Sequence, residues 1–260
     1  MADFILETKD GVARLTLNRP EIRNAFDDRL IADLTESLQA LSARDDLRAL
    51  VLTGKGKAFS AGADLNWMRA MAGYSREENF ADSQKLGRLM HALYHLPFTT
   101  IAAVNGPALG GGVGLVACCD IAIASDNAFF ALSEARLGLI PAVISPFVIA
   151  AIGARQAHRY FQTAERFSAV RACEIGLIHE IVDADELNMR VELLLKDILA
   201  NGPQAVRASK RLLRDVSGAM IDDTLLDETA KRIAEIRVSK EGQLGLSAFL
   251  QKKKPDWTER

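Results

Sequence analysis

Residues 100–112, TIAAVNGPALGGG, carry the strongest structural signal in the chain. The run Thr100 to Val104 is apolar and partly β-branched, which predicts a buried strand. The glycines lead into a small-residue apolar stretch from about Gly111, which predicts a helix. A loop that joins a strand to a helix N-terminus presents unpaired backbone N–H groups, which can bind an anion or developing negative charge. The same glycines could equally serve only a tight turn and close helix packing.

Outward from this stretch, strands and helices alternate. Apolar periodicity and turn residues predict a hairpin at 4–17 with Asp10-Gly11 at its turn, helices at 27–41 and 80–94, and strands at 49–53, 120–124 and 178–182. Strand, helix, strand is the order that produces parallel pairing. From about Arg155 the pattern is mostly helical. We therefore predict an α/β core at 1–195, followed by a helical C-terminal region at 196–260.

Composition excludes several classes of protein. The 260 residues are 49% hydrophobic and 25% charged with a net charge of −2, so a large core is expected and disorder of the whole chain is not. A net negative charge disfavours nucleic acid as a partner. Three cysteines cannot form a disulfide framework, no His or Cys spacing indicates a metal site, and the start resembles no signal peptide, so we expect a cytoplasmic protein. The uncharged run 137–154 contains Pro141 and Pro146, which argues against a membrane span.

A second strand-to-helix junction lies at residues 57–65, KAFSAGADL. It has the same character as the first, with an apolar approach, a glycine and an acidic residue. Asp64 is suited to cap the helix that follows, and we prefer this role to catalysis. Two such junctions at the ends of neighbouring strands could direct two N–H groups at one oxygen atom.

Taken together, these loops resemble those of the enoyl-CoA hydratase/isomerase, or crotonase, superfamily, and the resemblance covers essentially the whole chain. The matching segments are LNRP at 17–20, NAF at 24–26, FSAGADL at 59–65, IAAVNG at 101–106, ALGGG at 108–112, CDI at 119–121 and SEARLGL at 133–139. The resemblance implies a spiral of repeated strand-strand-helix units with a helical C-terminal trimerisation region. It also implies homotrimers, commonly paired into hexamers, and a thioester substrate that contains coenzyme A, with no separate cofactor.

The resemblance also assigns site residues. The backbone N–H groups of Ala63 and Gly111 would hold the thioester oxygen, with Gly110 beside them, and Glu134 would transfer protons. For the coenzyme A moiety it implies Ala61 and Leu65 near the adenine, Arg23 at a phosphate, and Phe249 and Lys252 supplied by a neighbouring subunit. The other reading of the lysines at 252–254 is a solvated basic tail. Trp67 and Met68 could line the acyl pocket, although they could equally be core residues.

One position departs from the family pattern. Hydratases of this family commonly use a second glutamate three residues beyond Gly111, where this chain has Gly114. Glu134 would then act as both acid and base. Our hypothesis is that the distal carboxylate of a dicarboxylic substrate occupies the space at Gly114, or that the substrate needs the room there. A cation for that carboxylate is expected, with Arg69 and Arg136 among the candidates.

Residues 140–148, IPAVISPFV, replace the glycine-rich segment of many relatives. This segment resembles that of bacterial methylglutaconyl-CoA hydratases and implies interconversion of 3-methylglutaconyl-CoA and 3-hydroxy-3-methylglutaryl-CoA in leucine degradation. Alternatives are hydration of an isohexenylglutaconyl-CoA in acyclic terpene degradation and double-bond isomerisation. A non-enzymatic alternative is RNA binding by the basic stripe of Arg207, Lys210, Arg211 and Arg214, which is more often a solvated or subunit-facing surface.

Overall fold

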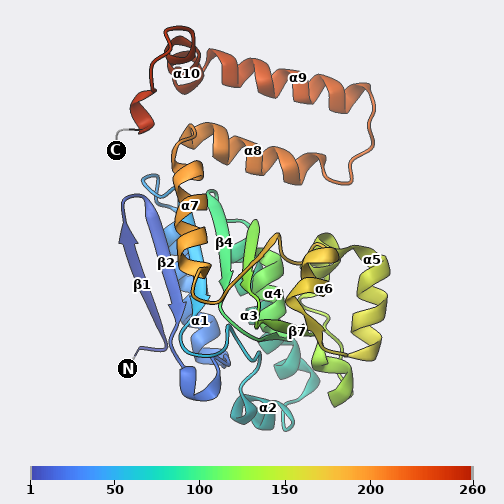
Figure 1. Cartoon of the computed structure of the whole chain (residues 1–260). Coiled ribbons are helices and arrows are strands. Elements are labelled where there is room, and N and C mark those ends of the chain that lie inside the picture. Colours follow the sequence, from blue (N-terminus) through green and yellow to red (C-terminus); the bar gives the residue numbers. More distant parts are fainter. Residues whose placement is uncertain (1, 259–260) are drawn as a thin grey trace.

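The computed structural model describes residues 2–258 and contains two sheets, one large and one small (Figure 1). The larger sheet holds, in spatial order, β1 (Phe4–Lys9), β2 (Val12–Leu17), β3 (Ala49–Gly54), β4 (Thr99–Val104), β6 (Ile121–Ser125) and β9 (Glu180–Val182). All neighbours in it are parallel except β1 and β2, which form the predicted hairpin. The smaller sheet consists of β5 (Ala108–Leu109), β7 (Phe129–Ala131) and β8 (Phe167–Ser168).

Four strands of the larger sheet, β2, β3, β4 and β6, are each followed by a short pairing in a second layer and then by a helix. β4, β5 and α4 (Gly111–Cys118) form one such unit, and β6, β7 and α5 (Ser145–Thr163) form the next. Earlier in the chain, single bridge residues take the place of the short strand: Ser60 pairs with Ala108, and Phe26 pairs with Ala63. This repetition is the spiral expected from the resemblance. The other helices are α1 (Asp28–Ser42), α2 (Leu65–Met71), α3 (Arg76–Tyr94), α6 (Ala169–Glu174) and α7 (Leu187–Leu199), with 3-10 turns η1 (Pro20–Ile22), η2 (Ser133–Leu137) and η3 (Asp256–Thr258).

Apolar residues bury both faces of the larger sheet. The main cluster joins one face to α1, α3, α4 and α5, and Leu30, Leu34 and Leu38 repeat at helical spacing along α1. The second cluster joins the other face to α7 through Leu187, Val191 and Leu195. Strands covered on both sides explain the continuous apolar run at 100–104.

The uncharged run 137–154 becomes a loop and the start of α5. Pro146 lies in the first turn of that helix, where a missing N–H group is tolerated, and Gly153 interrupts the helix with φ 73° and ψ 156°. Within residues 2–258, no helix has both the length and the apolar character required to cross a membrane.

The last three helices form an arm that extends from the rest of the chain: α8 (Pro203–Val216), α9 (Asp223–Val238) and α10 (Lys240–Leu250) (Figure 1). We call residues 203–258 the arm and residues 2–202 the body. The expected boundary at residue 195 falls inside α7, where Leu195 and Ile198 are part of the core. The change in organisation comes after α7, at Gly202.

Three of the four residues of the basic stripe face the body. Lys210 is buried, with Nζ 2.6 Å from Asp120 Oδ2 and 2.8 Å from the carbonyl oxygen of Phe98. Arg207 donates to the carbonyl oxygens of Arg44, Asp45 and Leu47, and Arg214 donates to that of Tyr94. The stripe is therefore an internal anchor, which removes the feature that favoured RNA binding.

Candidate active site

The two predicted loops lie against each other in the structure. Phe59 and Ser60 donate backbone hydrogen bonds to Pro107, and Leu109 donates to the carbonyl oxygen of Ser60 at 2.9 Å. Gly62 crosses this junction with φ 82°, and a Cβ atom there would lie 2.7 Å from the carbonyl oxygen of Leu109. Only glycine allows both this dihedral angle and this approach.

The backbone N–H groups of Ala63 and Gly111 are left without a partner among the described residues. Phe26 pairs on both sides of Ala63, because its N–H group donates to Gly62 at 2.8 Å and its carbonyl oxygen accepts from Asp64 at 3.0 Å. This parallel bridge directs the N–H group of Ala63 away from Phe26. Gly111 is the first residue of α4, where N–H groups have no partner within the helix.

Phe26 and Asn24 support these loops, and the periodicity of the sequence did not indicate them. A Cβ atom on Gly111 would lie 2.4 Å from Phe26 Cζ, so the ring packs directly against the first residue of α4. Asn24 is fully buried and donates from Nδ2 to the carbonyl oxygens of Lys55 and Ala58. The NAF segment at 24–26 was the available signal, but its role depends on contacts that are distant in sequence.

Glu134 lies beside the start of α4. The N–H group of Gly110 donates to Ala131 at 2.9 Å, which ties the glycine loop to β7, and the chain reaches Glu134 three residues later. Glu134 Oε1 lies 3.2 Å from the position of a Cβ atom on Gly110. Burial raises the pKa of the Glu134 carboxyl group, and Oε2 is buried with no hydrogen-bond partner among residues 2–258. A carboxyl group in this setting is suited to proton transfer.

The space at Gly114 is filled by hydrocarbon. A Cβ atom on Gly114 would lie 2.4 Å from Ile144 Cγ2 and 3.2 Å from Met90 Cε, and both of these side chains are buried. This arrangement argues against the hypothesis that a distal substrate carboxylate occupies the space at Gly114, because the side chain of Ile144 already fills it. The contribution of Gly114 is its lack of a side chain, which allows Ile144 to pack on α4.

Of the residues that follow Ala63, Asp64 and Trp67 have structural roles and Leu65 is exposed. Asp64 caps α2 as predicted, since its carboxylate accepts from the N–H groups of Asn66 and Trp67 at 2.8 and 3.2 Å. Trp67 is buried in the main core cluster, which supports the core reading over an open acyl-pocket wall. Leu65 is 69% exposed, so it is available to a ligand.

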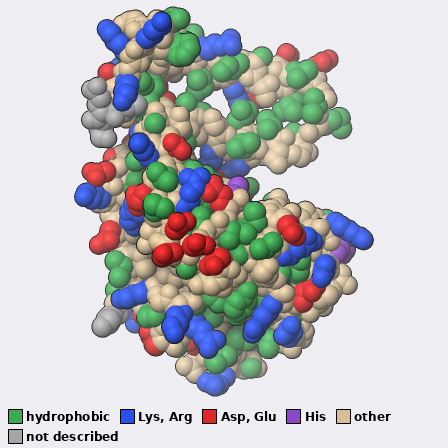
Figure 2. Space-filling model, viewed as in Figure 1, with side chains coloured by type: hydrophobic (Ala, Val, Ile, Leu, Met, Phe, Trp, Pro, Cys, Tyr) green, Lys and Arg blue, Asp and Glu red, His purple; other side chains and the backbone are tan. Residues whose placement is uncertain are grey.

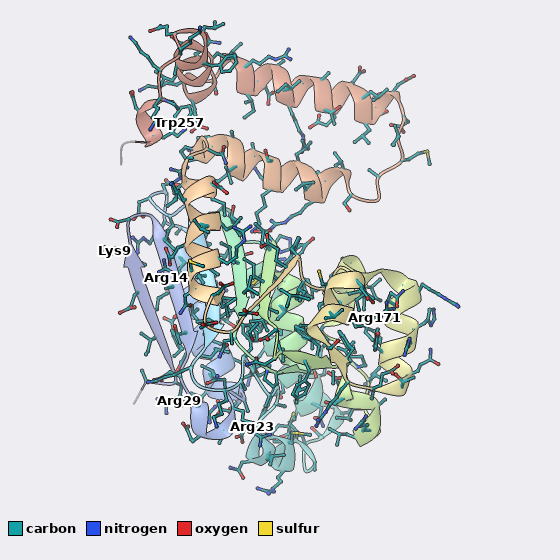
Figure 3. All side chains as sticks on the ribbon, in the orientation of Figure 1. Lys9, Arg14, Arg23, Arg29, Arg171 and Trp257 are labelled. Carbon is teal, nitrogen blue, oxygen red and sulfur yellow. The ribbon has the colours of Figure 1, made fainter. Side chains whose placement is uncertain are left out.

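The residues expected at coenzyme A lie at two ends of the molecule. Arg23 is exposed, with its carbonyl oxygen accepting from the N–H group of Ala61 at 2.9 Å, and it lies at the end of the body near α2 (Figure 3). Phe249, 79% exposed, lies in the last turn of α10, far from α2, and Lys252 comes just after that helix (Figure 1). One chain therefore does not bring these two groups together.

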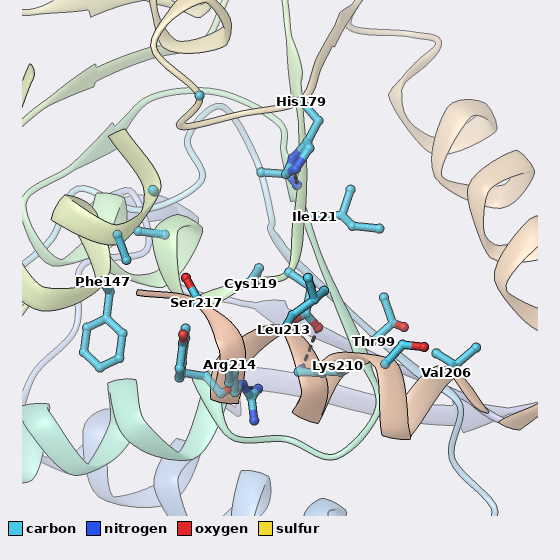
Figure 4. A pocket seen from close by; sticks show the side chains of 18 of the residues that line it. Thr99, Cys119, Ile121, Phe147, His179, Val206, Lys210, Leu213, Arg214 and Ser217 are labelled. Atoms are coloured by element: carbon cyan, nitrogen blue, oxygen red, sulfur yellow. Dashed lines mark hydrogen bonds and ion pairs between the residues drawn. The ribbon is translucent and has the colours of Figure 1, made fainter. Parts of the chain in front are cut away.

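A cavity of about 1030 Å³ lies elsewhere (Figure 4). It is bounded by α8 and by the starts of β4 and β6, and none of Ala63, Gly111 and Glu134 lines it. Figure 2 shows the hollow between the arm and the body. Because it contains no group of the candidate site, we assign it to the packing of the arm rather than to catalysis.

The arrangement can hold a carbonyl oxygen and move a proton next to it. Two free N–H groups would stabilise negative charge as it develops on that oxygen. Glu134 would exchange a proton with the carbon adjacent to the carbonyl group or with an attacking water molecule. This chemistry suits addition to, or proton transfer at, an unsaturated acyl group.

Comparisons with known proteins agree with this geometry. The family model described as enoyl-CoA hydratase/isomerase matches residues 7–260. The 2,3-dehydroadipyl-CoA hydratase of Escherichia coli is 33% identical over 262 residues, with 100% of both chains covered. Among solved structures, an enoyl-CoA hydratase from Shewanella pealeana is 45% identical with a TM-score of 0.95, covering 98% of this chain and 96% of that one. Pseudomonas aeruginosa AtuE is 38% identical with a TM-score of 0.94, covering 99% and 100%. The chain is an enzyme of the enoyl-CoA hydratase type and belongs to the enoyl-CoA hydratase/isomerase family.

Proposed function

We propose that this enzyme adds water to 3-methylglutaconyl-CoA to form 3-hydroxy-3-methylglutaryl-CoA, and catalyses the reverse reaction, as in leucine degradation. The observation that carries the proposal is one buried carboxyl group, Glu134, next to the free N–H groups of Ala63 and Gly111. The segment that follows Glu134 resembles that of bacterial methylglutaconyl-CoA hydratases.

In this mechanism a single carboxyl group performs both proton transfers. The thioester oxygen accepts hydrogen bonds from the N–H groups of Ala63 and Gly111, which stabilise the enolate formed as water adds to the β-carbon. The Glu134 carboxylate accepts a proton from that water molecule, and the resulting carboxylic acid donates a proton to the α-carbon. The hydroxyl group and the proton add across the double bond, and Glu134 returns to its starting state.

A dicarboxylic substrate is supported by two observations. The substrate name of the E. coli relative denotes the thioester of a dicarboxylic acid. In addition, two exposed arginines lie close to the site residues in sequence. Arg69 lies in α2, Arg136 lies two residues after Glu134, and neither forms an ion pair with another described residue. We propose that one of them binds the distal carboxylate, since Gly114 does not provide a site for it.

Two other reactions suit the same groups. The longer isohexenylglutaconyl-CoA has the same reacting carbons and differs in its tail. Double-bond isomerisation needs one carboxyl group to carry a proton between two carbons, and the single Glu134 satisfies that requirement without an activated water molecule. Product analysis separates isomerisation from hydration, because only hydration adds oxygen to the acyl chain. The two hydrations are separated by comparing the rates with the two substrates.

We further propose that coenzyme A lies across two copies of the chain. Arg23, Ala61 and Leu65 of one copy would meet the phosphates and adenine, and Phe249 and Lys252 would come from the arm of a second copy. This division accounts for their separation within one chain and for the exposed apolar surface of the arm. The assembly would be a trimer, or a hexamer of two trimers.

The deciding experiment is an assay of 3-methylglutaconyl-CoA hydration by the wild type and by Glu134→Gln, with isohexenylglutaconyl-CoA, crotonyl-CoA and a 3-enoyl-CoA as comparison substrates. We expect Glu134→Gln to lower kcat about 10²- to 10⁴-fold, the usual contribution of a general acid–base group. Glu174→Gln removes an exposed glutamate that pairs with Arg171 and should leave the rate unchanged. Hydration that persists in Glu134→Gln would refute the role of Glu134, and isomerisation without hydration would refute the proposed reaction.

The pH profile provides an independent check. Burial raises the pKa of Glu134, so hydration by the wild type should fall as the pH decreases through this raised pKa. A raised pKa in the folded state means that protonated Glu134 stabilises the fold at low pH, and that this contribution is lost as the pH rises through that pKa. Glu134→Gln should therefore be more stable than the wild type at neutral pH, with the difference vanishing below the ordinary pKa of glutamate. Thermal unfolding across this pH range measures it.

A further inference from the structure

Ser60 is fully buried between the two loops of the candidate site and contacts both of them. Its backbone binds the glycine loop before α4, because its N–H group donates to Pro107 at 3.2 Å and its carbonyl oxygen accepts from Leu109 at 2.9 Å. A Cβ atom on Gly112 would lie 2.6 Å from the carbonyl oxygen of Ser60 and 3.1 Å from its Cβ. Ser60 is therefore packed against the first turn of α4, where Gly111 presents its N–H group.

The hydroxyl group of Ser60 binds the other loop. It donates to the carbonyl oxygen of Asn24 at 2.9 Å, and its oxygen accepts from the N–H group of Gly62 at 3.2 Å. One hydroxyl group can form both bonds, since it has a proton to donate and lone pairs to accept. The carbonyl oxygen of Gly62 in turn accepts from the N–H group of Phe26 at 2.8 Å. Both peptide groups that flank Gly62 are thus held, one by Ser60 and the other by Phe26.

These bonds decide where the N–H group of Ala63 points. In a trans peptide the carbonyl and N–H groups point in opposite directions, so a Gly62 carbonyl directed at Phe26 turns the N–H group of Ala63 away from it. A Cβ atom on Gly62 would lie 3.6 Å from the backbone nitrogen of Gly111. Gly62 therefore lies beside the second N–H group, and its orientation sets the position of one N–H group relative to the other.

We propose that Ser60 is a positioning residue that sets the distance and angle between the N–H groups of Ala63 and Gly111. The inference rests on the proposed role of these two groups at the thioester oxygen. Without the hydroxyl group, the N–H group of Gly62 loses its buried partner, and a glycine has the conformational freedom to turn its peptide groups. The two N–H groups then no longer converge on one oxygen, and stabilisation of charge in the transition state depends on that convergence.

The first measurement is the hydration of crotonyl-CoA by the wild type and by Ser60→Ala, which removes one buried oxygen atom. We expect kcat to fall about 10- to 100-fold, since a displacement of about 1 Å in catalytic geometry can cost about 100-fold. KM should change little, because the interaction that is lost is one that strengthens in the transition state. The control is Ser125→Ala, which removes another fully buried hydroxyl group, 2.8 Å from Asn127 Oδ1, and should leave kcat unchanged.

The second measurement reports on the two N–H groups directly. Butyryl-CoA has no double bond to hydrate, and an isotopic label at its thioester carbonyl carbon allows the C=O stretching frequency of the bound ligand to be measured by infrared difference spectroscopy. Hydrogen bonds from two N–H groups lower this frequency. The lowering should be full in the wild type and in Ser125→Ala, and smaller in Ser60→Ala. A loss of stability alone does not change the frequency in protein that remains folded.

Ser60→Cys separates hydrogen bonding from the filling of space. The thiol occupies the site of the hydroxyl group but is a weak donor and a weak acceptor, so this variant should lose kcat and the frequency shift much as Ser60→Ala does. It also supplies the result if Ser60→Ala does not fold. A full frequency shift in Ser60→Cys would show that the hydrogen bonds of Ser60 do not position the N–H groups, and would overturn the proposal.

The remaining outcomes separate this proposal from the proposed reaction. A wild-type frequency in folded Ser60→Ala, a rise in KM at unchanged kcat, or an equal loss in Ser125→Ala would each overturn the role of Ser60. If the wild type itself shows no lowering, the assignment of Ala63 and Gly111 fails, and that of Ser60 fails with it. Failure to hydrate 3-methylglutaconyl-CoA would refute only the proposed substrate, because butyryl-CoA still decides the role of Ser60.

Discussion

The body buries many apolar side chains, whereas the helices of the arm bury almost none of theirs. Two apolar clusters fill the body on both faces of its larger sheet. In the arm, α9 and α10 have no buried residue, and α8 has only Lys210. Met220, Ile221, Val238 and Leu250 are each more than three-quarters exposed. The body therefore has a hydrophobic core of its own, whereas the arm presents apolar surface that a second copy covers only in the assembly proposed above.

The attachment of the arm also differs in kind from the packing of the body. Arg207, Lys210 and Arg214 contact backbone carbonyl oxygens, and Asp120, which pairs with Lys210, also accepts from the N–H and hydroxyl groups of Thr100. Interactions of buried charged groups fix the relative positions of two elements more than they add stability, because the cost of removing the charges from water offsets much of their attraction. We infer that these contacts set the direction of α8.

Gly111→Ala should have the largest effect on the body. The added Cβ would lie 2.4 Å from Phe26 Cζ, and overpacking of this kind destabilises a fold by about 1–3 kcal/mol. It would also displace the N–H group of Gly111, so hydration should fall with stability. Denaturant unfolding and the hydration assay measure both effects.

The control is Gly87→Ala, in α3, where the new Cβ would meet only Val143 Cγ1 at 3.8 Å. Alanine is favoured over glycine within a helix by about 1 kcal/mol, so this variant should be as stable as the wild type or more so. Equal stability of the two variants would show that the contact with Phe26 does not constrain Gly111.

Lys210→Met should affect the attachment of the arm more than the body. It leaves the carboxylate of Asp120 without its cation, and because that side chain is 29% exposed, we expect about 1–2 kcal/mol, less than for a fully buried pair. Hydrogen exchange should accelerate across residues 203–216 and remain slow in β4.

Arg211→Met is the control for this variant, since Arg211 lies next to Lys210 on α8 but is exposed. It should leave exchange in α8 unchanged. Similar exchange in the two variants would contradict the role of Lys210 as the anchor.

Phe249→Ser should have the smallest effect on a single chain. Its side chain is 79% exposed, so unfolding of the dilute protein should change by less than about 0.5 kcal/mol. If a second copy covers this side chain, the assembly should weaken, which light scattering over a range of concentrations detects. Gln251→Ser, an exposed polar neighbour, is the control, and an assembly that Phe249→Ser leaves intact would exclude Phe249 from the interface.

Local patterns predicted the body well. The hairpin turn is confirmed, with positive φ at Asp10 and Gly11, as are the parallel pairing of β2 with β3 and the cap at Asp64. These features depend on residues close in sequence, or on alternation that one buried face imposes. The interpretation of Arg207, Lys210 and Arg214 as a solvated or subunit-facing surface is wrong, because these side chains contact the body. Periodicity shows which side chains share a face but not what that face meets.

By itself, the sequence determined the order of strands and helices, the two glycine-containing loops and the presence of Glu134 in a segment typical of this family. Only the tertiary structure decided that Phe26 supports Gly111, that Ile144 fills the space at Gly114, and that the arm leaves the body after α7. The physical reason is that propensity and capping act between near neighbours, whereas steric exclusion at a glycine depends on side chains brought there by distant parts of the chain.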